Sequence, residues 1–142
     1  EYELRCVDIV DSWKDVSLKE RVSRANELHK KNKCIYLSIH SNAYGRGWTS
    51  PKGISTHVFG SSKLSNKYGK IFHDELICNF ENETRNRRLK HSNFYVLRMT
   101  KMPSILFEIG FHSNKEEAKK IMSNKWIDLV AKSIVDSCLI IE

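Results

Sequence analysis

The 142-residue sequence lacks closely spaced cysteine pairs, long apolar runs, internal repeats and low-complexity tracts. Its four cysteines stand far apart, which argues against a zinc knuckle and gives no reason to expect disulfides. Folding in a reducing cytoplasm fits this pattern. No segment approaches the roughly twenty apolar residues that a membrane-spanning helix needs. The first five residues have neither the basic start nor the apolar stretch of a signal peptide, although removal of a leader from a longer precursor stays compatible with the sequence.

The composition indicates one packed domain with a basic surface. Hydrophobic residues make up 40% of the chain, which suits a globular core, so we expect a single domain over residues 1–142. The formal net charge of +7 favours an anionic partner, such as a nucleic acid, a cell-wall polymer or a membrane surface. One dense basic cluster, residues 85–91, is either a solvated loop or a binding segment. No basic and aromatic recognition motif accompanies the charge, so nucleic acid is the weakest of these candidates.

Turn residues and apolar periodicity predict strands that alternate with helices. Ser17 and Glu20 form a capping box that opens a helix, and Asn32 suits the end of that helix. Ser61 or Ser62 caps a second long helix. The expected strands are residues 2–10, 34–40, 54–59, 94–97 and 104–107. Further helices are expected over residues 61–80, 114–122 and 123–138, and a loop over residues 81–93. This order predicts an α/β fold with a largely parallel central sheet, flanked by helices on both faces.

Two apolar runs end on side chains suited to hydrolytic chemistry. The first reaches His40, a neutral imidazole that either binds zinc or only makes a hydrogen bond at a strand end. The second reaches Glu108, which is either a general base with a raised pKa or a carboxylate that emerges into solvent. Ligands of open α/β sheets bind just outside the carboxyl ends of such strands, so the pair indicates a candidate metallohydrolase site. Among the other histidines, His57 is expected at the surface or half-buried, and His73 in solvent.

Four ordered motifs give the sequence a specific resemblance to a known family. They are residues 15–21 with Ala25 and Asn26, residues 38–43, residues 87–90 with 96–97, and residues 102–111 with 113–114. Through these motifs nearly the whole chain resembles the zinc-dependent N-acetylmuramoyl-L-alanine amidases of the amidase type 3 family. This family includes bacterial autolysins and phage endolysins.

The resemblance implies a reaction, a cofactor and site residues. Family members cut the amide between the lactyl group of N-acetylmuramic acid and the first L-alanine of the peptidoglycan stem peptide. Zinc (Zn²⁺) is held by two His and one Glu. By similarity, His40 is one zinc ligand, Glu108 is the catalytic general base, and Asn42 and Arg87 contact the substrate. The expected partner is peptidoglycan, and the expected place of action is the cell wall, with a cytoplasmic location before release because the sequence shows no signal peptide.

The sequence departs from the family in one respect. The family's first zinc His follows its first strand and its zinc Glu lies on the next helix, and neither motif occurs in this sequence. We therefore expect the chain to lack the family's first strand and first helix, about thirty residues. Two interpretations remain open. Either the chain is an incomplete part of a full enzyme, which we favour, or it is a catalytically inactive module with a degenerate amidase fold that binds peptidoglycan.

Overall fold

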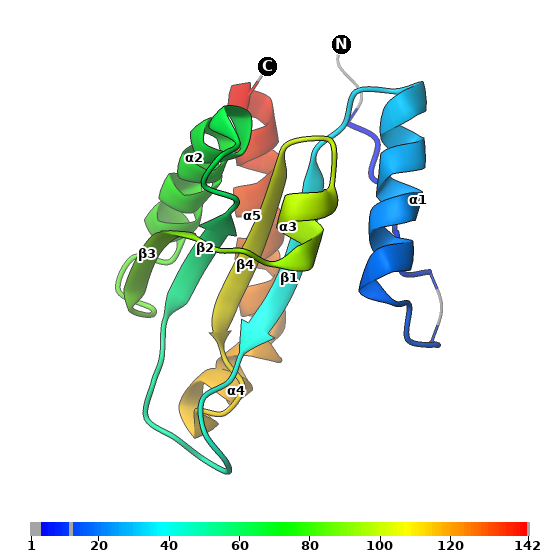
Figure 1. Cartoon of the computed structure of the whole chain (residues 1–142). Coiled ribbons are helices and arrows are strands. Elements are labelled where there is room, and N and C mark those ends of the chain that lie inside the picture. The colour runs from blue at the N-terminus through cyan, green and yellow to red at the C-terminus, as the bar shows by residue number, and fades with distance from the viewer. Residues whose placement is uncertain (1–3, 12, 142) are drawn as a thin grey trace.

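The computed structural model describes residues 4–11 and 13–141, which form a four-stranded sheet with helices on both of its faces (Figure 1). The strands lie in the order β1-β4-β2-β3, and their bounds are Tyr36–Asn42 (β1), Ile54–Val58 (β2), Asn86–His91 (β3) and Ser104–Phe111 (β4). β1 pairs with β4 and β2 pairs with β3 in parallel, whereas β2 and β4 are antiparallel. The expected α/β fold with a largely parallel sheet is confirmed.

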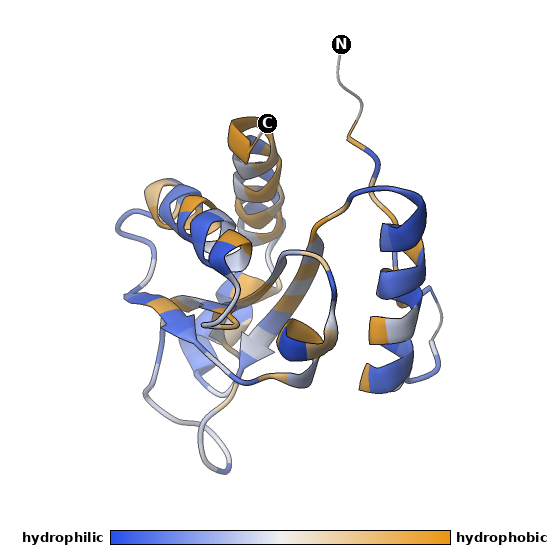
Figure 2. Cartoon of the chain, turned by 45° about the horizontal axis from the view of Figure 1, so that its top comes forward, coloured by the Kyte–Doolittle hydropathy of each residue, from blue (hydrophilic) through white to orange (hydrophobic). Residues whose placement is uncertain are grey.

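The helices divide the apolar residues between two cores. Their bounds are Leu18–Lys31 (α1), Lys63–Asn79 (α2), Tyr95–Met99 (α3), Lys115–Ile121 (α4) and Asn124–Ile141 (α5). On one face of the sheet, α2 and α5 enclose the larger core, which contains Phe72 and Trp126. On the other face, α1 and α3 contribute Val22 and Leu97 to a smaller core. Figure 2 shows α5 as largely hydrophobic and α1 as largely hydrophilic, consistent with their unequal shares of the core. None of the described helices has both the length and the apolar character to cross a membrane.

Side-chain caps explain where the long helices begin. The Ser17 hydroxyl accepts a hydrogen bond from the Glu20 backbone N–H at 3.2 Å, and the Ser62 hydroxyl accepts one from Ser65 N–H at 3.2 Å. Each bond satisfies a backbone donor that the first helical turn leaves unpaired. The predicted cap at Ser17 is therefore confirmed, and Ser62 rather than Ser61 caps α2.

Asn26 ties α1 to the rest of the molecule. Its side-chain amide donates to the carbonyl of Met99 at 3.2 Å and its amide oxygen accepts from the backbone N–H of Lys101 at 2.8 Å. Met99 is the last residue of α3 and Lys101 lies between α3 and β4, which explains structurally why an asparagine stands in this helix.

Three sequence predictions are wrong. Residues 4–10 are not a strand, because they pair with no strand of the described chain and leave Leu4 and Val7 about half exposed. Residues 2 and 3 of the predicted strand lie outside the described part of the chain. Residues 86–91 form strand β3 instead of a loop, since backbone pairing to β2 tolerates polar side chains at a sheet edge. Residues 95–99 are helical instead of extended, which buries the adjacent Val96 and Leu97 against one core.

Two histidines are buried, contrary to the sequence predictions. His57 and His73 are each only 7% exposed. The His73 ring bridges α2 to the sheet, with its Nδ1 3.0 Å from the Thr56 hydroxyl and its Nε2 3.1 Å from the Asn86 side-chain oxygen. The His57 Nδ1 lies 2.7 Å from the Ser92 hydroxyl. Burial lowers the pKa of both rings, and for His57 burial together with the charge of Lys90 lowers the pKa to about 4.

We expect the free energy of unfolding to fall as the pH drops from about 6.5 towards 4. In the unfolded chain His57 takes up a proton near pH 6.5, whereas in the folded chain it stays neutral down to a pKa of about 4. The unfolded state therefore binds more protons in this range, and His57 alone removes about 3 kcal/mol of stability. Urea denaturation of the wild type and of His57→Gln at pH 7 and pH 4.5 measures this difference. Equal pH dependence in the two proteins would contradict the account.

Candidate active site

The sheet brings His40 and Glu108 together. β1 and β4 run parallel, and in their register His40 and Glu108 are direct Cα partners. Side chains alternate between the two faces of a strand, so both residues lie on the same face of the sheet as Tyr36 and Leu106, which belong to the smaller core. Two side chains separated by 68 positions in the chain therefore stand side by side near the carboxyl ends of adjacent strands.

His40 has the chemistry of a metal ligand. The residue is exposed, and its Nε2 lies 2.9 Å from the hydroxyl of Ser38, two residues earlier on the same strand. Partial desolvation of the ring lowers its pKa, and the positive charge of Arg21 lowers it further. The neutral imidazole, which is the form that binds metal ions, is thus favoured around neutral pH.

Glu108 has the properties of a general base. Its Oε2 is buried, and no group of the described chain forms a hydrogen bond with it. Burial raises the pKa of this carboxyl, and the charge of Lys90 opposes that rise. A buried carboxylate oxygen without a partner is unfavourable in a structural role, and it is ready to accept a proton from a ligand.

The two residues expected at the substrate, Asn42 and Arg87, both lie beside Phe111. Asn42 ends β1 as the Cα partner of Phe111, and its side-chain oxygen accepts a hydrogen bond from the N–H of Ala43 at 2.8 Å. The Arg87 guanidinium carbon lies 5.0 Å from the centre of the Phe111 ring. In the register of β1 and β4 the Asn42–Phe111 pair directly follows the His40–Glu108 pair, with a bulge between them, so both side chains lie next along the sheet from the candidate base. Contact with a substrate stays a prediction.

Sequence reasoning missed a buried carboxylate that organises this region. Glu117 in α4 is 3% exposed, and it accepts hydrogen bonds from the backbone N–H groups of Gly53, at 2.9 and 3.0 Å, and Phe111, at 2.8 Å. The Thr84 hydroxyl donates to it as well. Glu117 thus joins the end of β4 to the chain segments that lead into β2 and β3. The cap at Asn114 places Glu117 in the first turn of α4, which was the available sequence signal.

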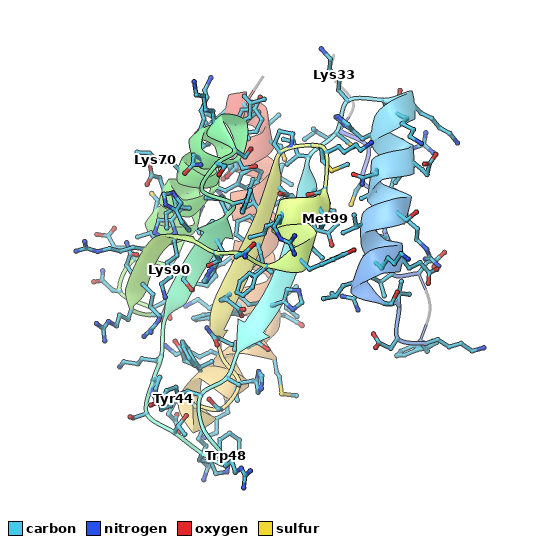
Figure 3. The ribbon with its side chains drawn as sticks, in the orientation of Figure 1. Lys33, Tyr44, Trp48, Lys70, Lys90 and Met99 are labelled. Atoms are coloured by element: carbon cyan, nitrogen blue, oxygen red, sulfur yellow. The ribbon has the colours of Figure 1, made fainter. Side chains whose placement is uncertain are left out.

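Gly53 is required at its position beside Glu117. Its φ is +118°, and a Cβ atom built on it would lie 2.3 Å from the backbone oxygen of Arg85. No other residue fits there without moving the backbone. The loop that leads to Gly53 exposes two large aromatic side chains, Tyr44 and Trp48, at the end of the sheet where β1 ends (Figure 3).

The described residues contain no complete metal site. Within residues 4–11 and 13–141, no three His, Cys, Asp or Glu side chains are grouped so that they could hold a metal ion. A catalytic zinc takes three protein ligands. His40 fits the role of one of them, and Glu108 beside it fits the role of a base that acts without binding the metal.

Comparison with known proteins supports the resemblance. The family model described as N-acetylmuramoyl-L-alanine amidase matches residues 3–139. The germination-specific N-acetylmuramoyl-L-alanine amidase of Bacillus subtilis is 34% identical over 123 residues, which are 86% of this chain and 49% of that protein. The endolysin of Bacillus phage SPP1 is 28% identical over 80% of this chain and 42% of its own length. This chain therefore spans about half the length of these two curated relatives, or less.

A solved amidase structure also resembles this chain. The N-acetylmuramoyl-L-alanine amidase from Clostridium difficile 630 superimposes with a TM-score of 0.77 and 32% identity, covering 87% of this chain and 64% of that one. The family match, which extends over almost all of the sequence, agrees with both the sheet topology and the ordered motifs. The chain belongs to the amidase type 3 family of N-acetylmuramoyl-L-alanine amidases.

Proposed function

We propose that the protein hydrolyses the amide between N-acetylmuramic acid and L-alanine in peptidoglycan, in a zinc-dependent reaction at the cell wall. The observation that carries this proposal is the buried Oε2 of Glu108, which has no hydrogen-bond partner among the described residues, on a residue whose Cα partner in the sheet is His40. Membership of a family whose relatives are named as amidases of this bond supports the choice of reaction.

Glu108 moves the proton in this proposal. Its Oε2 accepts a proton from the water whose oxygen attacks the carbonyl carbon of the lactyl amide. As the carbon–nitrogen bond breaks, Glu108 returns the proton to the nitrogen of L-alanine, which leaves as a free amine. The pKa of the carboxyl, raised by burial, brings it closer to neutral pH, where a general acid–base group works best.

Zinc supplies the remaining chemistry when it is bound. It lowers the pKa of a coordinated water towards about 7 and polarises the amide carbonyl. We propose His40 as one zinc ligand. Because the described residues contain no complete ligand set, we also propose that the other ligands lie outside residues 4–11 and 13–141.

A second candidate function is a module that binds peptidoglycan without cutting it. The lack of a three-ligand group among the described residues favours it. The two proposals differ in whether a bond is broken, so binding to cell walls alone does not separate them.

Identification of the cleaved bond tests the proposed reaction. The full-length protein, supplied with zinc, is incubated with purified peptidoglycan, and the new end groups are analysed by labelling and mass spectrometry. We expect new amino-terminal L-alanine and no new reducing sugar ends. New reducing ends would indicate a glycosidase, and new amino groups on residues other than the first L-alanine would indicate a peptidase. Either result would contradict the proposal.

A further inference from the structure

A bulge in β3 places two cationic side chains on the face of the sheet that carries Glu108. In the pairing with β2, Asn86 is the partner of Ile54 and Leu89 is the partner of Thr56. β3 therefore advances three residues where β2 advances two. The extra residue makes positions 86 and 89 share one face, although strict alternation would separate them.

Side-chain contacts identify the two faces. The side chain of Asn86 reaches His73 on α2, and Leu89 packs against the core that α2 covers.

Arg87 and Lys90 lie on the opposite face. Arg87 stacks on Phe111, and Lys90 is the direct Cα partner of His57. His57 pairs in turn with Leu106, two residues before Glu108 on β4, so Arg87 and Lys90 lie on the candidate active-site face. Figure 3 shows Lys90 on the β3 side of the sheet.

Arg88 holds the bulge in a conformation that most residues avoid. Its φ is +69°, in the left-handed region, and its backbone N–H donates to the Asn86 side chain at 2.7 Å. Strained residues of this kind persist where the surroundings fix them, and they are frequent at ligand sites. At this position the strain accompanies a bulge that places Arg87 and Lys90 on the sheet face of the candidate base, with Arg87 against Phe111 and the charge of Lys90 acting on Glu108.

Neither cation, Arg87 or Lys90, is held in a salt bridge within the described residues. The Arg87 guanidinium donates a hydrogen bond to the backbone carbonyl of Lys52 at 3.4 Å. The Nε of Arg87 is buried, and no described group forms a hydrogen bond with it. Burial lowers the pKa of the Lys90 ammonium, the charge of Arg87 lowers it further, and Glu108 raises it. Two neighbouring, partly desolvated cations repel each other, and an anionic ligand relieves that repulsion.

We infer that Arg87 and Lys90 form a subsite for a carboxylate of the stem peptide. This inference rests on the proposed function. The lactyl carboxyl of N-acetylmuramic acid is consumed in the amide to be cut, so the acidic groups near that bond belong to the peptide. The first of them is the α-carboxyl of the second residue, which is free when the residue is D-isoglutamate and amidated when it is D-isoglutamine. A guanidinium and an ammonium bind a carboxylate through charge-assisted hydrogen bonds that a carboxamide cannot match.

Paired ligands that differ only in this group test the subsite. The full-length protein carrying Glu108→Gln, which is expected to bind without turnover, is titrated calorimetrically with N-acetylmuramoyl-L-alanyl-D-isoglutamate and with its D-isoglutamine counterpart. We expect the acid to bind about tenfold more tightly than the amide, as for one charge-assisted interaction. Adding Lys90→Gln should bring the ratio of the two dissociation constants close to one, and Lys90→Arg should keep most of the preference. Arg85→Gln, which removes an exposed cation next to β3, is the matched control and should leave the ratio unchanged.

Three results would overturn the inference. The first is equal affinity for the two ligands, and the second is an unchanged ratio of their dissociation constants in Lys90→Gln. The third is displacement of the acid ligand by inorganic phosphate at the same concentration, which would indicate a general anion site for wall phosphates. Failure of the proposed function is distinguishable, because it would appear as the absence of cleavage of either ligand by the zinc-supplied wild type. The ratio of dissociation constants does not depend on cleavage.

Discussion

Replacing Glu108 by glutamine is expected to lower kcat for amide hydrolysis by about a thousandfold, within the range typical of lost general acid–base catalysis. Glutamine keeps the shape of the side chain, but it cannot take a proton from water or return one to the departing nitrogen. The measurement is the rate at which the zinc-supplied full-length protein and its Glu108→Gln variant release L-alanine amino groups from a soluble muropeptide. The Michaelis constant should change little, because the substitution removes an interaction made in the transition state.

The same variant should fold at least as well as the wild type. Burial raises the pKa of Glu108, so the folded state disfavours the ionised carboxylate that is present at neutral pH. Replacing it with a neutral amide removes that penalty. Glu116→Gln is the matched control, since Glu116 is exposed and should affect neither the rate nor the stability. A Glu108→Gln variant that retains more than about a third of the wild-type rate would rule out Glu108 as the base.

Replacing Glu117 by alanine is expected to lower the free energy of unfolding by about 3–5 kcal/mol. The carboxylate accepts backbone N–H groups from Gly53 and Phe111 and the hydroxyl of Thr84, and all three would lose their partner in a buried region. Each unpaired buried donor costs about 1–3 kcal/mol. Urea denaturation at pH 7 measures the change. Glu116→Ala, which removes the adjacent but exposed carboxylate, should stay within about 0.5 kcal/mol of the wild type.

The position of Glu117 links this stability to the active site. Phe111 is held by Glu117 through its backbone and carries Arg87 on its ring. Loss of the carboxylate should therefore weaken the preference for the acid ligand as well as the fold. A Glu117→Ala variant as stable as Glu116→Ala would show that the buried hydrogen bonds contribute little.

Local signals in the sequence predicted the parts of the fold that depend on local chemistry. The caps at Ser17 and Ser62 satisfy donors within their own helices, so the sequence alone could indicate them. The run ending at Glu108 is apolar because both faces of β4 are largely covered, and that pattern is visible without a structure. The run ending at His40 is less covered, because β1 lies at the sheet edge and leaves Ile39 51% exposed. Their placement in one site required only that the two strands be parallel neighbours.

The errors concern elements whose structure depends on distant partners. β3 is polar and half-exposed, and it is a strand because β2 pairs with it. Val96 and Leu97 sit in a single helical turn because both pack into a core built by other segments. Burial of His73 depends on its bonds to Thr56 and Asn86, which no local pattern shows. Arg87 and Lys90 lie on the same face of the sheet because of a bulge in β3 that the sequence did not reveal.

The most direct test of the central claim is whether hydrolysis of peptidoglycan depends on zinc. The full-length protein is stripped of metal with a chelator, assayed for release of L-alanine amino groups from purified peptidoglycan, and assayed again after zinc is restored. The account predicts negligible release without zinc and recovery when zinc returns, with no recovery in the Glu108→Gln variant. Binding to the cell wall without release of amino groups, at any zinc concentration, would contradict the account and favour the inactive binding module.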